Sequence, residues 1–124
     1  MANVLAPISV GELLDKITIL EIKKEHVQDP IKLANIDTEL NELNALAKKL
    51  GDDTLDDLFS KLKRVNQVIW LVEDQIRIKE RNKEFDAAFV QLAREVYINN
   101  DLRAEIKREI NIATKSYIIE EKIY

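Results

Sequence analysis

The sequence predicts an all-α protein, a helical bundle of about five helices built on a long antiparallel helical hairpin. Only 2 of its 124 residues are Gly and only 2 are Pro, far too few for the turns of a β-sandwich or barrel. Apolar residues recur three and four positions apart through most of the chain, as they do on one face of an α-helix. The length is that of one domain, residues 1–124.

The first helix is predicted over residues 10–28. Ser9 and Glu12 have the spacing of a capping box, in which the Ser9 hydroxyl accepts from the Glu12 amide and the Glu12 carboxylate reaches back to the Ser9 amide. Apolar side chains lie on most sides of this helix, so we expect it to be central in the bundle. Asp29 and Pro30 have the cap and first-turn chemistry that begins a second helix.

The second and third helices, predicted over residues 30–50 and 54–81, make the long hairpin. Each carries one narrow apolar seam of the coiled-coil type. Gly51 is placed to end the second helix, and Asp52, Asp53 and Thr54 are placed to cap the third. Because the turn is short, we expect the two helices to pack antiparallel, with the first helix lying across them.

Two shorter helices and a tail complete the prediction. The apolar period breaks after Asn82 and restarts, which predicts a helix over residues 85–98. The polar run 99–101 favours a corner, followed by a fifth helix over residues 101–114. The remaining residues, 115–124, are so rich in apolar side chains that we expect this tail to pack on the bundle or on a second subunit.

Composition and charge argue against several classes of protein. With no Cys and a single His, the chain lacks the ligands of a typical zinc or cluster site, and we expect no metal and no cofactor. A net charge of −4 weighs against nucleic-acid binding. No 18-residue stretch is free of charge, so we expect a cytoplasmic protein without membrane association. The long seams and apolar tail predict a homodimer.

Glu73 and Arg77 are the sharpest pair of candidate site residues on the third helix. They lie four residues apart beside the apolar seam, which is the spacing of an exposed, helix-stabilising ion pair. The same stripe would instead form part of a ligand site if it faced a cleft against the first helix. There Asp15, Lys16 and Lys23 are available, and a partly buried arginine would need a carboxylate or an anionic ligand.

Arg103, Lys107 and Arg108 form a second candidate group, near the end of the chain. Like charges four residues apart repel slightly unless an anion lies between them. The three residues are therefore either ordinary surface charges or an anion site suited to a carboxylate or phosphate, which Arg77 could complete.

Four segments of the chain resemble an uncharacterised family of short bacterial and phage proteins, a domain of unknown function. The opening ISVGELLDKITILEIK, residues 8–23, carries the resemblance, and the segments 70–80, 97–111 and 120–124 extend it over nearly the full length. The family has no established activity, so the resemblance implies membership and no reaction. Its segments contain all of the candidate residues, which favours one shared cleft: Asp15, Lys16, Lys23, Glu73, Arg77, Arg103, Lys107 and Arg108.

The sequence thus predicts a non-catalytic helical module that binds a protein partner or a small anionic ligand. The alternative is a small all-α enzyme acting on a dicarboxylate or phosphate substrate, similar to a chorismate mutase in arrangement only. In such an enzyme, Arg and Lys side chains act by positioning and electrostatics. An enclosed pocket with several converging cations would favour the enzyme over the module.

Overall fold

A computed structural model describes residues 1–51 and 53–123 of the chain. The described residues form four α-helices, one short 3-10 helix and no β-strand, so the predicted all-α class is confirmed. The elements in chain order are α1 (Val10–His26), α2 (Pro30–Lys48), η1 (Asp53–Leu55), α3 (Asp56–Arg81) and α4 (Ala87–Ala113). The caps predicted at Asp52 and at the Asp53 side chain, and the tail residue Tyr124, lie outside what is described.

The starts of α1 and α2 follow the capping chemistry in the sequence, whereas α3 begins two residues later than predicted, after an N-cap residue, Leu55, that makes no side-chain cap hydrogen bond. Ser9 Oγ accepts from the Glu12 amide at 3.0 Å, and Asp29 Oδ1 accepts from the Ile31 amide at 2.9 Å. These side-chain acceptors satisfy amides that have no partner inside the helix. α1 and α2 therefore begin as predicted, and each ends two residues earlier than predicted.

The predicted count of five helices is wrong, because the helices predicted over residues 85–98 and 101–114 are one continuous helix, α4. The helix continues through the polar run 99–101, where the prediction placed a corner. Asn99 and Asn100 donate their side-chain amides to the carbonyls four residues earlier, at 2.8 and 2.9 Å. Since these bonds leave the backbone ladder intact, the two asparagines do not break the helix.

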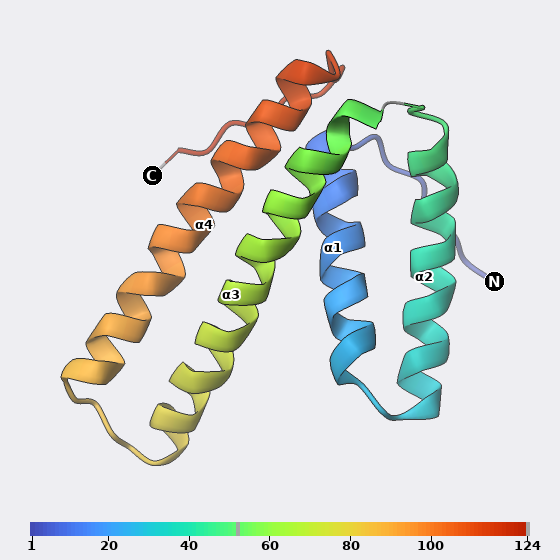
Figure 1. The fold of residues 1–124 in the computed structure, drawn as a ribbon. Coiled ribbons are helices and arrows are strands. Elements are labelled where there is room, and N and C mark those ends of the chain that lie inside the picture. The colour runs from blue at the N-terminus through green and yellow to red at the C-terminus, as the bar shows by residue number, and fades with distance from the viewer. Residues whose placement is uncertain (52, 124) are drawn as a thin grey trace.

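The long hairpin also forms between different helices from those predicted. In Figure 1, α1 lies between α2 and α3, and it contacts α2, α3 and α4. The long antiparallel partner of α3 is α4. The hairpin predicted for residues 30–50 and 54–81 is therefore wrong, because α1, which is apolar on several sides, packs between them. The central position predicted for the first helix is confirmed.

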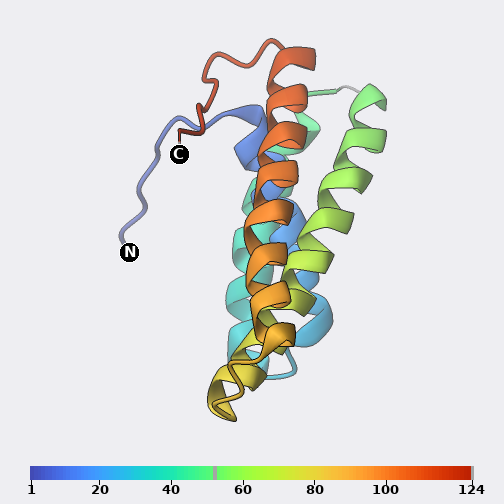
Figure 2. The ribbon, with the colours of Figure 1, turned by 90° about the vertical axis from the view of Figure 1, so that its left-hand side faces the viewer.

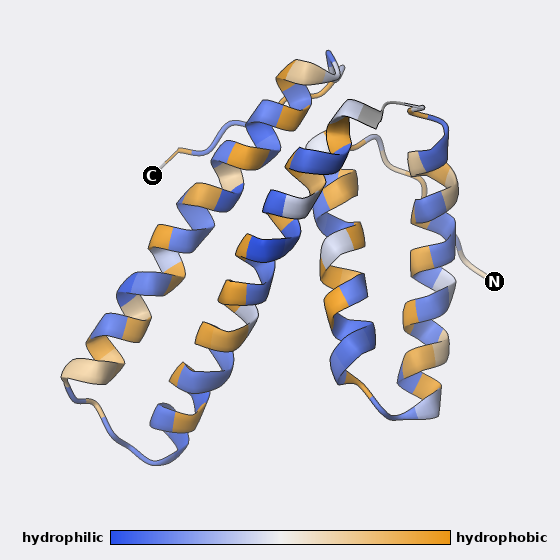
Figure 3. Cartoon of the chain, viewed as in Figure 1, coloured by the Kyte–Doolittle hydropathy of each residue, from blue (hydrophilic) through white to orange (hydrophobic). Residues whose placement is uncertain are grey.

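The hydrophobic core lies where α1 faces the other three helices. Along each helix, apolar and polar residues alternate at helical spacing, as the hydropathy colouring of Figure 3 shows. Burying one large aliphatic side chain contributes about 1.5–3 kcal/mol to the stability of the folded state. The contacts of α1 with the other helices are therefore a major source of the stability of the bundle. The buried members of the core are Leu13, Leu14, Ile17, Leu20, Leu40, Leu55, Leu62, Val65, Ile106 and Ile110.

The last described residues turn back along α4. Lys115 has a positive φ of 52°, and the Ser116 amide donates to the Asn111 carbonyl at 2.8 Å, as at many helix C-termini. We call residues 116–123 the C-terminal strap. Figure 2 shows it leaving the end of α4 on the side of the bundle where the N-terminal segment also lies. The prediction that the tail packs on the bundle is confirmed by its contacts with α1 and α4.

Candidate functional site

Asp15 is the centre of a buried polar network that links three helices. The residue lies on α1 and is fully buried. Arg103 of α4 donates from Nε to both Asp15 carboxylate oxygens, at 2.9 and 3.1 Å, and from Nη2 to Oδ2. Asn66 of α3 donates to Asp15 Oδ1 at 2.8 Å and to Thr18 Oγ1 at 2.7 Å. These bonds offset the free-energy cost of removing the carboxylate from water.

Lys107 lies one turn after Arg103 and faces three carboxylates. Its Nζ is 2.6 Å from Glu12 Oε2, 3.3 Å from Glu120 Oε1 and 3.9 Å from Asp15 Oδ2. Partial burial lowers the pKa of Lys107, but the Glu12 hydrogen bond and the attraction of the three carboxylates outweigh that effect and raise it above its usual value. The amine is therefore a permanent cation at neutral pH.

A close approach of α1 to α4 brings these side chains together. The Gly11 amide donates to Asn111 Oδ1 at 2.7 Å. A Cβ placed on Gly11 would lie 2.6 Å from the Lys107 carbonyl oxygen and 2.9 Å from Asn111 Oδ1. Because real Cβ atoms do not approach other atoms so closely, glycine is required here for the two backbones to meet.

Glu12 departs from the predicted capping box. Its amide is held by Ser9 as predicted, but its carboxylate accepts from Lys107 across the helix interface. The residue therefore contributes to the polar site and not only to the helix start.

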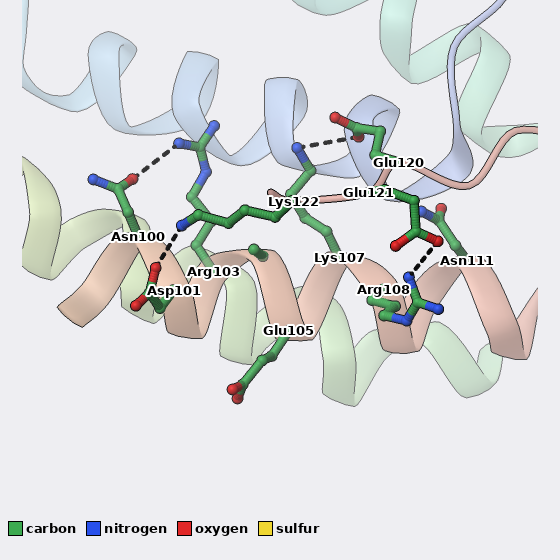
Figure 4. Close-up of a pocket in the computed structure, with 11 residues that line it drawn as sticks. Asn100, Asp101, Arg103, Glu105, Lys107, Arg108, Asn111, Glu120, Glu121 and Lys122 are labelled. Carbon is green, nitrogen blue, oxygen red and sulfur yellow. Dashed lines mark hydrogen bonds and ion pairs between the residues drawn. The ribbon is translucent and has the colours of Figure 1, made fainter. Parts of the chain in front are cut away.

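A groove of about 540 Å³ runs along α4 beside this cluster. The strap forms one of its walls, and three ion pairs join the strap to α4 in Figure 4. Their shortest distances are 3.3 Å from Lys107 to Glu120, 3.0 Å from Arg108 to Glu121 and 2.6 Å from Lys122 to Asp101. The lining residues are Asn100, Asp101, Arg103, Ala104, Glu105, Lys107, Arg108, Asn111, Glu120, Glu121 and Lys122.

The groove lining is electrically balanced. It carries four cationic and four carboxylate side chains, and each of the four cations lies within 4 Å of a carboxylate. A ligand carboxylate or phosphate would therefore enter by replacing a carboxylate of the chain itself. Among the described residues, no group of three or more His, Asp or Glu side chains is arranged to hold a metal ion.

The structure brings together three of the predicted site residues and places two more nearby. Asp15, Arg103 and Lys107 form the cluster itself. Arg108 lies at the groove wall with Glu121. Lys16 lies at the edge, with its Nζ 3.8 Å from a Glu12 carboxylate oxygen.

Three other predicted site residues lie away from the cluster. Arg77 is 72% exposed, and its Nε is 3.7 Å from Glu73 Oε2, so the pair does not line a cleft with α1 as the shared-cleft hypothesis required. The nearby space between α1 and α3 holds a ring stack of His26 on Trp70, with ring centroids 5.0 Å apart. The side chain of Lys23 is exposed and is not part of the groove lining.

Two buried asparagines of the site were not among the predicted residues. Asn66 directly follows Val65, a buried residue of the apolar seam. Asn111 directly follows the buried Ile110. Because a polar residue beside an apolar seam is normally expected to face solvent, the periodicity of the chain provides no signal for either asparagine.

The helices and the groove together define a small all-α protein whose polar surface groove is walled by its own C-terminal strap. The chain belongs to a family of unknown function, DUF6165, whose family model matches residues 4–124. This match confirms membership in a domain of unknown function over nearly the full length. Searches of curated proteins and of solved structures give no match to the chain.

In the part of the chain that the structure describes, no helix combines the length and apolar character needed to cross a membrane.

Proposed function

We propose that the protein is a non-catalytic binding module that accepts an anionic group, a carboxylate or a phosphate, in the groove along α4. The observation that carries the proposal is the position of Glu120. Its carboxylate comes from a non-helical segment and accepts from Ser9 Oγ at 3.1 Å, with Lys107 Nζ at 3.3 Å. The groove therefore already has the donors that a ligand carboxylate or phosphate would use.

The donors are held in place by residues other than the strap. Ser9 is fixed as the cap of α1, and Lys107 is fixed by Glu12. Donors that are ordered before binding lose little conformational entropy when a ligand arrives. One anionic group with two or three charge-assisted hydrogen bonds supports an affinity of roughly millimolar Kd, and a second anionic group would strengthen it.

The groove favours a binding module over the enzyme alternative. That alternative requires an enclosed pocket in which several cations converge without carboxylate partners. The groove is open to solvent, and Arg103, Lys107 and Arg108 each have a carboxylate within 4 Å. No observation of the described residues points to a reacting group.

The experiment is a titration of the full-length chain with citrate and with inorganic phosphate, followed by amide chemical shifts at constant ionic strength. We expect saturable shifts at Ser9, Glu12 and Lys107. The variant Arg108→Gln, at the half-exposed groove wall, should weaken citrate binding about fivefold, or ~1 kcal/mol. Lys107→Gln should weaken it further, and circular dichroism would check that this variant remains folded.

The matched control is Lys23→Gln, which removes one positive charge from an exposed site outside the groove. It should bind citrate as the unmodified chain does. Shifts that do not saturate, or an equal loss in Lys23→Gln, would contradict the proposed function.

The proposal includes the predicted homodimer. Large apolar side chains remain exposed on the hairpin of α3 and α4, among them Leu71, Ile98 and Leu102, and a second copy would remove them from water. Light scattering with size-exclusion chromatography tests this directly. A monomeric mass at micromolar concentration would contradict it.

A further inference from the structure

The C-terminal strap occupies the position that the proposed ligand would take. Glu120 lies against Lys107 and Ser9, and the next residue, Glu121, pairs with Arg108. We infer that Glu120 and Glu121 of the strap occupy the anion-binding positions along α4, so that the strap must leave before an anionic ligand binds. The inference rests on the proposed function, and it concerns the regulation of that site and the class of its ligand.

The strap also indicates how many anionic groups the ligand presents. Lys107 and Arg108 are neighbours in sequence, so their side chains leave α4 about 100° apart. Each is met by a different carboxylate of the strap, as Figure 4 shows. A ligand that replaces both contacts therefore carries two anionic groups, spaced like the side chains of two consecutive glutamates.

Little apolar burial holds the strap in place. Tyr117 is fully exposed and Ile123 nearly so. The ion pairs of Glu121 with Arg108 and of Lys122 with Asp101 join side chains that are each at least one-third exposed, and such pairs contribute little to stability. The strap therefore belongs to the least stable part of the molecule and can open without unfolding the bundle.

Opening the strap leaves the floor of the site intact. Arg103 keeps its bonds to Asp15, and Lys107 keeps its bond to Glu12. Release of the strap takes the Glu121 carboxylate away from Arg108 and the Glu120 carboxylate away from Lys107. Both side chains can then donate hydrogen bonds to the anionic groups of a ligand.

The test compares citrate binding by the full-length chain and by the double variant Glu120→Gln/Glu121→Gln. Both substitutions keep the size of the side chain and remove its charge. When only a fraction of the molecules has an open site, the apparent Kd equals the intrinsic Kd divided by that fraction. The double variant should have a larger open fraction, so we expect it to bind citrate about tenfold more tightly. As citrate is added, the amide chemical shifts of the strap residues should move toward the values of a disordered chain.

The matched control is Glu39→Gln/Glu42→Gln, which makes the same change in net charge on the exposed face of α2. Its affinity for citrate should equal that of the unmodified chain, since the net charge has changed but no contact in the groove has.

A second set of ligands distinguishes the source of the two carboxylates. It consists of a synthetic peptide with the sequence of residues 116–124 and of its counterpart with both glutamates replaced by glutamine. Binding of the first peptide but not of citrate assigns the two carboxylates to a protein segment, and binding of citrate assigns them to a small molecule.

The outcomes separate the two proposals. Equal or weaker citrate binding by Glu120→Gln/Glu121→Gln overturns the strap inference and leaves the proposed function standing. Absence of binding by every chain, with citrate and with both peptides, overturns the proposed function. Tighter citrate binding by Glu120→Gln/Glu121→Gln but not by Glu39→Gln/Glu42→Gln, together with release of the strap, supports both proposals.

Discussion

Two pairs of a carboxylate and an arginine occupy contrasting regions of this molecule. Asp15 and Arg103 join α1 to α4 across 88 residues, with side chains 1% and 28% exposed. Glu73 and Arg77 lie one turn apart on α3, with side chains 40% and 72% exposed. Both pairs join a carboxylate to a guanidinium group, but only Asp15 also accepts a hydrogen bond from Asn66 and lies close to Lys107.

The contrast shows that burial, and not residue type, decides what such a pair does. A buried carboxylate has lost its water, so each bond of its network is needed, and removing one partner leaves an unpaired charge. An exposed pair exchanges its contact for water at little cost. The polar site therefore lies where partners from different helices meet, and it does not follow the stripe of charges along α3.

Removal of the Asp15 carboxylate should give the largest effect. We expect Asp15→Ala to lower the free energy of unfolding by about 3–5 kcal/mol, because Arg103 and Asn66 both lose a buried acceptor. Urea denaturation followed by circular dichroism measures the change. Glu73→Ala is the control, with an expected change below about 0.5 kcal/mol. Similar losses in the two variants would remove the distinction between the pairs.

The close approach at Gly11 allows the buried pair to form and gives the next largest effect. Alanine in an open helix position stabilises by about 1 kcal/mol relative to glycine. At Gly11 the added Cβ would overlap the Lys107 carbonyl oxygen, so we expect Gly11→Ala to destabilise by about 1–3 kcal/mol. The sign of the change in unfolding free energy is the test, and an increase would show that the helices are not in contact there.

The same contrast explains how much of the molecule could be predicted from its sequence. Helix class and helix starts depend on neighbours in the chain, so the Ser9 and Asp29 caps were predicted correctly. The corner at 99–101 was not, because asparagine favours turns unless its side chain bonds within the helix. The pairing of Asp15 with Arg103 requires knowing which helices touch, and periodicity alone does not distinguish it from Glu73 and Arg77.

Lys107 gives the buried region a dependence on pH. Its pKa in the folded protein is raised above the ordinary lysine value. The stability that it contributes is therefore fully present below the unfolded pKa and is lost as pH rises through the higher folded pKa. We expect the free energy of unfolding to fall above about pH 10, and to fall less steeply in Lys107→Met.

The control for this pH series is Lys23→Met, which removes an exposed lysine outside the network. Unfolding curves of the three chains, measured at several alkaline pH values, give the comparison. If Lys107→Met follows the unmodified chain at every pH, the carboxylates around Lys107 do not stabilise its charged form.

The smallest effect is the coupling between Glu73 and Arg77. A double-mutant cycle with Glu73→Ala and Arg77→Ala should give a coupling energy of about 0.3–0.5 kcal/mol, the usual range for an exposed pair four residues apart. Salt screens such pairs, so the coupling should vanish near 1 M sodium chloride, where the screening length is about 3 Å. The same cycle with Asp15→Asn and Arg103→Gln should give a larger coupling that salt reduces little, because the Asp15 carboxylate is buried. Coupling of Glu73 to Arg77 that is large and resistant to salt would mean that the α3 stripe is covered in solution, as a second copy of the chain would cover it.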